Sequence, residues 1–149
     1  MARVHPNINF RVVVTINEND LPGIDDLVKK HLVFIGGVKI NQCPHMYEQS
    51  DIMFLPSLIE CFSACYPEAM RMKKPILVPD LGFATVICKN AAQYFDPNSI
   101  ESLGEALYDL CTDANLRGRL VENGTEQLKE FNNYEQRANK LLGILESLV

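Results

Sequence analysis

Short apolar runs alternate with more polar, helix-like stretches along the first hundred residues. Five runs rich in Val, Ile, Leu and Phe predict strands at residues 10–16, 32–35, 51–55, 75–78 and 93–95. The runs are apolar at nearly every position, which is typical of strands that are covered on both faces in a parallel sheet. We therefore expect a parallel sheet with helices on its faces.

Helical patterns fill the stretches between these runs and dominate after residue 98. We expect helices at residues 21–30, 43–50, 64–73, 100–111, 115–131 and 134–149. Asp113 and Asn133 precede the last two helices and are suited to cap them, because their side-chain oxygens accept from free backbone N–H groups. Gly124 is interpreted as a bend between helical segments. The alternation predicts an α/β fold, a Rossmann-like doubly wound parallel sheet with C-terminal helices.

Composition narrows the class of protein. A chain of 149 residues suits one domain or a piece of a larger protein. The 14 basic and 19 acidic residues give a net charge of −5, which argues against a nucleic-acid partner. No apolar run reaches the roughly 18 residues of a membrane span, and residues 1–6 lack the apolar core of a signal peptide. Five cysteines without a Cys-x-x-Cys spacing favour reduced, mostly buried thiols in a cytoplasmic protein.

The sequence motifs of several common enzyme and binding activities are missing from this chain. The sequence contains no Gly-x-Gly-x-x-Gly, no Gly-Lys-Ser/Thr, no His-Glu-x-x-His and no Asp-x-Asp. It therefore does not support a dinucleotide dehydrogenase, a Walker-type phosphate loop, a zinc protease or a metal-bound nucleotide sugar. Cys43 and His45 lie close together, but two ligands are too few to predict zinc. We expect no metal and no other cofactor.

The segment 50–80 reads as strand, loop, helix and strand. Its loop leaves the carboxyl end of the predicted strand 51–55, where open α/β sheets bind ligands. Ser63 is suited to cap the helix 64–73, whose free N–H groups would favour an anion. Glu60 in the loop and Glu68 on the helix flank that point, and Asp80 after the next strand borders the same edge.

The two glutamates suggest a ligand with several hydroxyl groups. We expect Glu68 on the apolar stripe of its helix, where a carboxylate needs a partner such as a vicinal diol. A nucleotide sugar contains these groups in the same order, because its ribose carries a diol, its diphosphate is an anion and its hexose is a second polyol. The spacing alone leaves a plainer interpretation open, in which Glu68 is an exposed helix residue without a ligand.

The same segment resembles the C-terminal, donor-binding domain of GT-B glycosyltransferases, specifically the retaining family 4, also called group 1. The matching positions are Pro56-Ser57, Glu60, Phe62, Glu68-Ala69-Met70 and Pro75-Ile76-Leu77-Val78. Upstream, residues 33–38 look like the family's strand and glycine turn beside the base. Further matches in order and spacing are Tyr47, Ser50-Asp51 and Tyr94-Phe95-Asp96-Pro97. The likeness runs from about residue 8 to residue 145 and repeats the two glutamates with seven residues between them.

The resemblance implies roles for the residues of this segment. Glu68 would hold the ribose hydroxyls. Glu60, the implied catalytic residue, would contact the donor hexose. The backbone of Phe62, Ser63 and Ala64 would face the diphosphate. The reaction implied is transfer of a hexose from a nucleotide-diphosphate sugar with retention of configuration and without a metal.

The resemblance also assigns the base and the partners. Gly36 would lie beside the base, and Val38 would meet the base through its main chain. The implied donor is a UDP- or GDP-sugar, and the family's N-terminal, acceptor-binding domain would be a partner. The resemblance also admits peripheral membrane association of the parent enzyme. Four leucines of the last predicted helix form a stripe that favours packing, or self-association where that domain is absent: Leu141, Leu142, Leu145 and Leu148.

The chain departs from the family in two ways. The family usually has glycine at the positions of Cys61 and Ser63, where the backbone approaches phosphate. An Arg and a Lys that neutralise the diphosphate have no match, since Arg3, Arg11 and Lys39 stand in other contexts. We therefore expect residues 1–149 to be a donor domain truncated at its N-terminus, with weak nucleotide affinity and no transfer activity alone.

Two other classes remain open. One is a non-catalytic module of the same fold that binds nucleotide or acts as a scaffold. The retained pair of Glu60 and Glu68 favours the transferase over such a module. The other is a flavodoxin-like domain, which would carry an acidic cluster after its first strand, and residues 16–18 fit that poorly.

Overall fold

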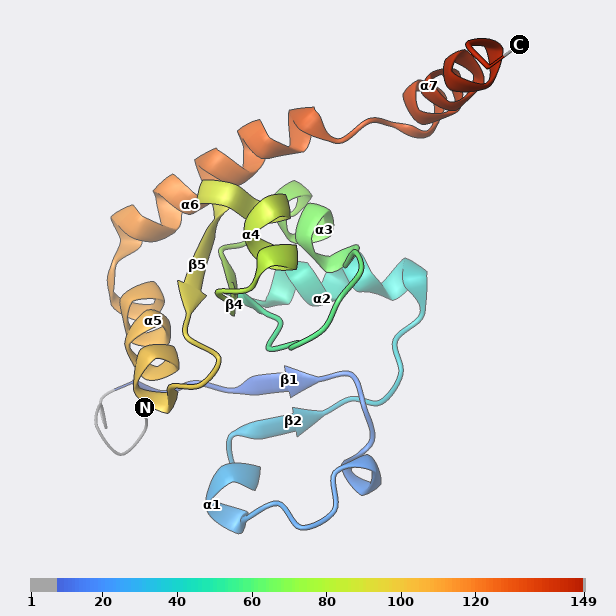
Figure 1. Cartoon of the computed structure of the whole chain (residues 1–149). Helices are drawn as coiled ribbons and strands as arrows, with labels where there is room; N and C mark the ends of the chain where they lie inside the picture. The colour runs from blue at the N-terminus through green and yellow to red at the C-terminus, as the bar shows by residue number, and fades with distance from the viewer. Residues whose placement is uncertain (1–7, 149) are drawn as a thin grey trace. The chain divides into compact units, whose positions relative to one another are not determined.

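The computed structural model describes residues 8–148. Residues 1–7, which include Arg3 and the segment compared with a signal peptide, and Val149 lie outside the described residues. The chain divides into two compact units, Met1–Asp51 (unit 1) and Ile52–Val149 (unit 2). Figure 1 labels the elements along the chain.

Unit 1 contains a two-stranded parallel sheet. Strand β1 (Val12–Val14) pairs with β2 (Leu32–Phe34), and Val12 lies opposite Leu32. The crossover between them holds the 3₁₀ turn η1 (Glu18–Asp20) and the short helix α1 (Asp26–Lys29). After β2 follow η2 (Ile40–Gln42) and helix α2 (Cys43–Gln49). Both strands and α2 confirm the predicted elements.

The predicted helix 21–30 is wrong over its first half. Gly23 has φ +82°, a left-handed conformation that ends helical geometry, so residues 21–24 form a turn. The helix begins only after Asp25, whose side chain accepts a hydrogen bond from the Leu27 N–H at 2.7 Å. Pro22 therefore marks a turn and not the start of a helix.

Unit 2 contains a three-stranded parallel sheet in the order β3-β4-β5. The strands are β3 (Met53–Phe54), β4 (Ile76–Pro79) and β5 (Ala92–Phe95). The helices that follow them are α3 (Cys65–Arg71), α4 (Gly82–Cys88), α5 (Ile100–Thr112), α6 (Ala114–Gln127) and α7 (Tyr134–Glu146), with 3₁₀ turns η3 (Lys89–Ala91) and η4 (Leu128–Glu130). The central strand β4 is buried along its whole length. The predicted parallel α/β class is confirmed, although the described strands form two sheets and not one.

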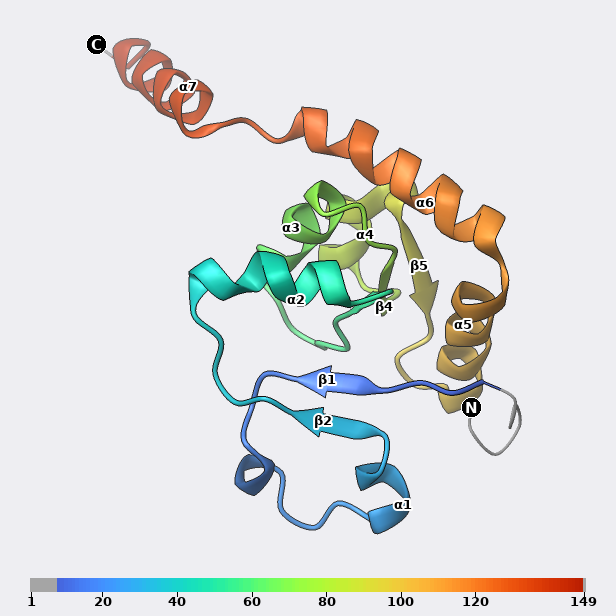
Figure 2. The ribbon, with the colours of Figure 1, turned by 180° about the vertical axis from the view of Figure 1, so that it is seen from behind.

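A hydrophobic cluster of unit 2 lies between the sheet and helices α5 and α6. Helices α5 and α6 lie beside β5 in both views of the ribbon (Figure 1 and Figure 2). The buried cluster joins Leu77 of β4 and Phe95 of β5 to three helical residues, Ala106, Leu110 and Leu120. Burial of such side chains is the main source of stability, at about 25 cal/mol per Å² of apolar surface. This core fixes the two strands whose carboxyl ends carry Asp80 and Asp96.

The predicted helix caps are confirmed. Asp113 accepts from the Leu116 N–H at 2.9 Å, and Asn133 accepts from the Gln136 N–H at 2.8 Å. Gly124, in contrast, does not mark a bend. It lies buried inside α6, and a Cβ atom at this position would come within 3.2 Å of Met70 Cγ on α3. The glycine therefore allows α6 to approach α3 closely.

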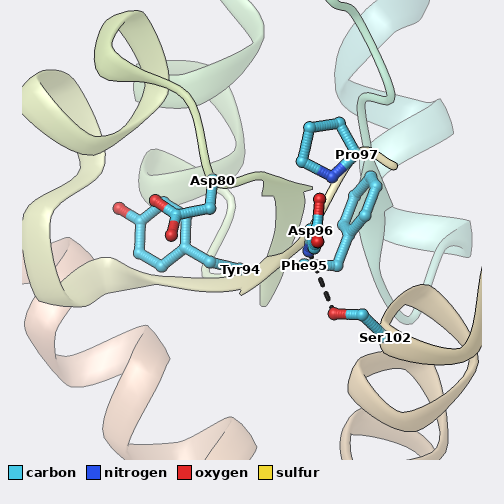
Figure 3. Close-up of a pocket in the computed structure, with 6 residues that line it drawn as sticks. All are labelled: Asp80, Tyr94, Phe95, Asp96, Pro97 and Ser102. Carbon is cyan, nitrogen blue, oxygen red and sulfur yellow. Dashed lines mark hydrogen bonds between the residues drawn. The ribbon is translucent and has the colours of Figure 1, made fainter. Parts of the chain in front are cut away.

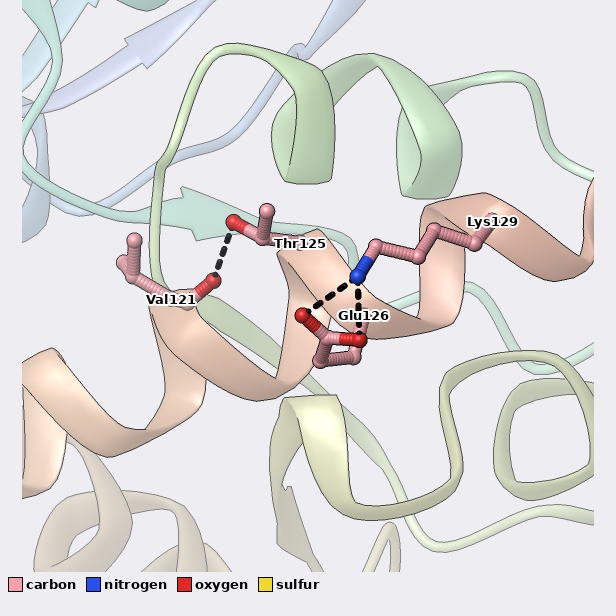
Figure 4. Close-up of polar contacts among 4 residues, drawn as sticks. All are labelled: Val121, Thr125, Glu126 and Lys129. Atoms are coloured by element: carbon pink, nitrogen blue, oxygen red, sulfur yellow. Dashed lines mark hydrogen bonds and ion pairs between the residues drawn. The ribbon is translucent and has the colours of Figure 1, made fainter.

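The exposed side of α6 and of the η4 turn that follows it carries local polar contacts (Figure 4). Lys129 Nζ donates to both carboxylate oxygens of Glu126, at 2.8 and 2.6 Å, and Thr125 Oγ1 donates to the Val121 carbonyl at 2.9 Å. An exposed pair of this kind contributes only about 0.3–0.5 kcal/mol. These contacts support the helix and carry no chemistry.

Helix α7 and the residues after it expose the predicted leucine stripe. The four leucines of the stripe are between 55 and 77% exposed: Leu141, Leu142, Leu145 and Leu148. The stripe is exposed in this chain, as expected where the N-terminal domain is absent, and self-association through it stays a prediction. Within residues 8–148 no helix combines the length and apolar character needed to cross a bilayer.

Candidate functional site

The carboxyl ends of β3, β4 and β5 meet at one edge of the sheet, because the three strands are parallel. The loop 55–64 leaves β3 at this edge. Asp80 follows β4 and Asp96 follows β5, and the Asp80 N–H donates to the Phe95 carbonyl at 2.8 Å. Ligands of open α/β sheets bind at this edge. The sequence therefore placed the Glu60 loop and Asp80 correctly at the edge that can bind a ligand.

An open hollow of about 410 Å³ lies at this edge, and Figure 3 shows its lining. The residues around it are Asp80, Tyr94, Phe95, Asp96, Pro97 and Ser102. The Asp96 N–H donates to Ser102 Oγ at 3.0 Å, and Asp96 Oδ1 accepts from the Asn98 N–H at 2.9 Å. Asp96 therefore holds the start of α5 in place, and Asp80 supplies the second carboxylate of the hollow. The sequence comparison matched residues 94–97 to the family but did not predict this hollow.

Glu60 lies half-buried in the loop between β3 and α3. The loop is held at its start by the Leu55 N–H, which donates to the Leu77 carbonyl at 3.1 Å, and by Ser57 Oγ, which donates to the Ile59 carbonyl at 3.2 Å. At its end the Phe62 ring meets Phe131 edge-on, with ring centroids 6.4 Å apart. The loop around Glu60 thus has a defined conformation.

Glu68 lies on the exposed side of α3, so the prediction that it shares the apolar stripe is wrong. The buried stripe of α3 consists of Tyr66, Ala69 and Met70, at the spacing of one helix face. Its members bury more apolar surface than the alternative face with Ala64 and Cys65 would. Glu68 is consequently an exposed residue of this helix.

Ser63 does not cap α3, so the predicted cap is also wrong. The helix begins at Cys65 with Ala64 as its N-cap residue, and no cap side chain accepts a hydrogen bond there. The Ser63 carbonyl accepts from the Tyr66 N–H at 3.3 Å, and the residue as a whole is only 8% exposed. Phe62 and Ala64 on either side are exposed. Ser63 is therefore a buried residue between two exposed neighbours.

Three titratable side chains of unit 2 have pKa values raised by burial, which disfavours their charged forms. Burial, followed by the nearby Cys88 and Glu60, raises the pKa of Tyr66 to about 12. Burial likewise raises the pKa of Cys88 to about 12 and raises the pKa of Tyr94. All three remain neutral at physiological pH. Cys88 is the buried cysteine, whereas Cys61 is exposed, so the expectation of mostly buried thiols holds only in part.

Tyr66→Phe is expected to raise the free energy of unfolding by about 1 kcal/mol, because a buried polar group without a partner costs about 1–3 kcal/mol. Tyr66 is fully buried, and its hydroxyl has no hydrogen-bond partner among residues 8–148. Tyr94→Phe is the matched control and should lower the free energy of unfolding, since the Tyr94 hydroxyl donates to the Lys89 carbonyl at 2.6 Å. Urea denaturation followed by circular dichroism measures both, and a less stable Tyr66→Phe chain would contradict this account.

Gly36 and Val38 belong to unit 1, whereas Glu60, Phe62, Ser63, Ala64 and Glu68 belong to unit 2. Gly36 follows β2 with φ +70°, and its N–H donates to the Ile16 carbonyl at 3.2 Å, beyond the end of β1. Val38 follows two residues later and is half-buried. Both residues thus lie at the carboxyl edge of their own parallel sheet.

Among residues 8–148, no three His, Cys, Asp or Glu side chains gather as ligands for a metal ion. Cys43 and His45 therefore stay without further metal-binding neighbours in the described part of the chain. His45 Nδ1 instead lies 3.0 Å from Glu48 Oε2 on the exposed surface of α2.

The fold is that of GT-B glycosyltransferases. Sucrose-phosphate synthase from Thermosynechococcus elongatus superimposes with a TM-score of 0.73, at 21% identity over 94% of this chain and 38% of that one. The C-terminal domain of a glycosyl transferase group 1 family protein from Francisella tularensis gives a TM-score of 0.66, at 24% identity over 86% of this chain and 71% of that one. Both comparisons cover the parallel α/β architecture described above.

The family follows from the sequence itself. Residues 25–127 match the family described as glycosyl transferases group 1, and the chain belongs to that family. An uncharacterized glycosyltransferase of Methanocaldococcus jannaschii is 21% identical over 151 aligned residues, which cover 97% of this chain and 39% of that protein. The chain thus spans about two fifths of the length of this relative and of the synthase.

Proposed function

We propose that this chain is the donor-binding part of a retaining glycosyltransferase that moves a hexose from a UDP- or GDP-sugar to an acceptor without a metal. Membership of the glycosyl transferases group 1 family supports glycosyl transfer. The observation that carries the donor assignment is the Glu60–Glu68 segment at the carboxyl edge of the β3-β4-β5 sheet. Absence of an Asp-x-Asp pair in the sequence supports metal independence.

Each predicted site residue has a role in this proposal. Glu68, exposed on α3, binds the two ribose hydroxyls, since its two carboxylate oxygens match two donors. Glu60 binds the hexose and acts in the transfer step. The backbone of Phe62, Ser63 and Ala64 binds the diphosphate, and the two outer residues of the three are exposed. Gly36 and Val38 of unit 1 contact the base in this proposal, and that assignment rests on the sequence resemblance alone.

Transfer itself belongs in this proposal to a protein that also carries an acceptor-binding half. The relatives are longer than this chain, which spans 39% of the Methanocaldococcus protein. From residues 1–149 alone we expect weak nucleotide binding and no transfer. Measurable retaining transfer by these residues alone would contradict that assignment.

Titration of the chain with UDP and GDP, followed by calorimetry and ligand-observed NMR, tests the proposal. Saturable binding of at least one of the two nucleotides is expected, while uridine and guanosine bind more weakly because they lack the diphosphate. If neither nucleotide binds at millimolar concentration, the donor-binding proposal is wrong.

Glu60→Gln is expected to weaken binding of a nucleotide sugar about tenfold while leaving the nucleotide alone within about twofold. The reason is that Glu60 would contact only the hexose, through hydrogen bonds that its charge strengthens. The measurement compares UDP-glucose with UDP and GDP-mannose with GDP. Equal losses for sugar and nucleotide would place Glu60 elsewhere. No change in any of the four affinities would favour the non-catalytic nucleotide-binding module.

A further inference from the structure

The amide side chain of Asn17 lies against Gly36 at the carboxyl edge of the unit 1 sheet. A Cβ atom built on Gly36 would lie 3.0 Å from Asn17 Oδ1, which is closer than ordinary van der Waals contact, so the glycine lets the amide lie against the backbone without a shift. Asn17 follows β1 and Gly36 follows β2, and the two strands are parallel neighbours. The two residues are 19 positions apart in the sequence, and the fold brings them together at the carboxyl edge of the unit 1 sheet, the kind of edge at which open α/β sheets bind ligands.

The amide of Asn17 is accessible, whereas the polar side chains around it serve the fold. Asn17 is exposed. Glu18 forms an ion pair with Lys29, and Asp20 Oδ2 accepts from the Asn17 backbone N–H at 2.8 Å. On the β2 side, Gln42 Oε1 accepts from the Lys39 N–H at 3.0 Å.

We propose that Asn17 is a specificity-determining residue that binds the edge of the nucleobase. This inference rests on the proposed function, in which Gly36 lies beside the base. A carboxamide presents one acceptor and one NH₂ donor side by side. Uracil and guanine both present a carbonyl oxygen next to a ring N–H, so the Asn17 Nδ2–H donates to that carbonyl and Asn17 Oδ1 accepts from the ring N–H.

Asn17→Asp separates the two bases by their hydrogen-bonding pattern. A carboxylate only accepts, so it faces the uracil carbonyl with a repulsive contact and loses one hydrogen bond. Guanine still offers two donors to it, the ring N–H and the 2-amino group. We expect the affinity for UDP to fall about tenfold or more while the affinity for GDP stays within about threefold.

The same substitution leaves the local fold intact. Asn17 precedes η1 as its N-cap residue, and Asp serves that position as well as Asn does. Thermal unfolding of the variant should therefore match that of the unchanged chain. A purely structural Asn17 would alter UDP and GDP binding equally.

The experiment titrates the unchanged chain, Asn17→Asp and Asn19→Asp with UDP and with GDP. Asn19 is also exposed and lies two positions on, so its substitution adds the same charge without touching Gly36 in the described structure. The expected result is a shifted ratio of UDP to GDP affinity in Asn17→Asp only. An unshifted ratio, or the same shift in Asn19→Asp, overturns the role of Asn17 while nucleotide binding stands. If the unchanged chain binds neither nucleotide, the proposed function and this inference fall together.

Discussion

Glu68→Ala is expected to weaken the binding of both UDP and GDP by at least about 100-fold, since two hydrogen bonds to a charged group contribute about 1.5–3 kcal/mol each. The carboxylate lies on the exposed side of α3, close in sequence to the loop that carries Glu60. Its predicted ligand, the ribose diol, is common to both nucleotides, so the loss should not depend on the base. Calorimetric titration of the two nucleotides measures it.

The control for Glu68→Ala is Glu122→Ala. Glu122 is also an exposed glutamate in a helix, α6, so its removal changes net charge and helix propensity in the same way. We expect nucleotide affinity to stay within about twofold in the control and circular dichroism to stay unchanged in both. Unchanged nucleotide affinity in Glu68→Ala would contradict the assignment of Glu68 to the ribose. An equal loss of affinity in Glu122→Ala would mean that the loss comes from the change in net charge. Glu68→Gln, which keeps two polar atoms without the charge, should fall between the two.

The strands of this fold could be predicted because most of them are short and apolar on both faces. All four residues of β4 are buried, and such a run has no polar interruption to confuse with a helix. Helix α4 was not predicted. Its sequence contains Thr85, Val86 and Ile87, which favour strands, and the helix exists because Ala84 and Cys88, one turn apart, pack into the interior. Packing against the rest of unit 2 overrode local preference there.

The orientation of α3 shows what the sequence could not decide. Two faces of this helix carry apolar residues, one with Ala64 and Cys65 and the other with Tyr66 and Met70. Periodicity alone does not choose between them. The larger side chains of the second face bury more surface, and Glu68 turns outward as a result.

The location of the candidate site was predictable, and its neighbours were not. Parallel strands bring their carboxyl ends together wherever they occur, so the loop with Glu60 and the turn at Asp80 had to share an edge. The approach of Asn17 to Gly36 depends on the register of β1 with β2, which places Val14 opposite Phe34 and which no local pattern specifies. Contacts of this kind, between segments distant in the sequence, can be identified only in the structure.

Leu110→Ala is expected to lower the free energy of unfolding by about 3–4 kcal/mol, because it removes buried methyl groups and leaves a cavity. Leu110 is fully buried in α5, in the cluster that contains Leu77 of β4 and Phe95 of β5. Leu141→Ala is the matched control, since Leu141 is 63% exposed on α7 and its loss should change stability by less than about 0.5 kcal/mol. Urea denaturation followed by circular dichroism measures both. The free energy of unfolding of a whole domain is only about 5–15 kcal/mol. Leu110→Ala should therefore also loosen the strand ends that carry Asp80 and Asp96. Nucleotide binding should then weaken as the temperature rises. Equal effects of the two substitutions would mean that the stability of unit 2 does not reside in this cluster.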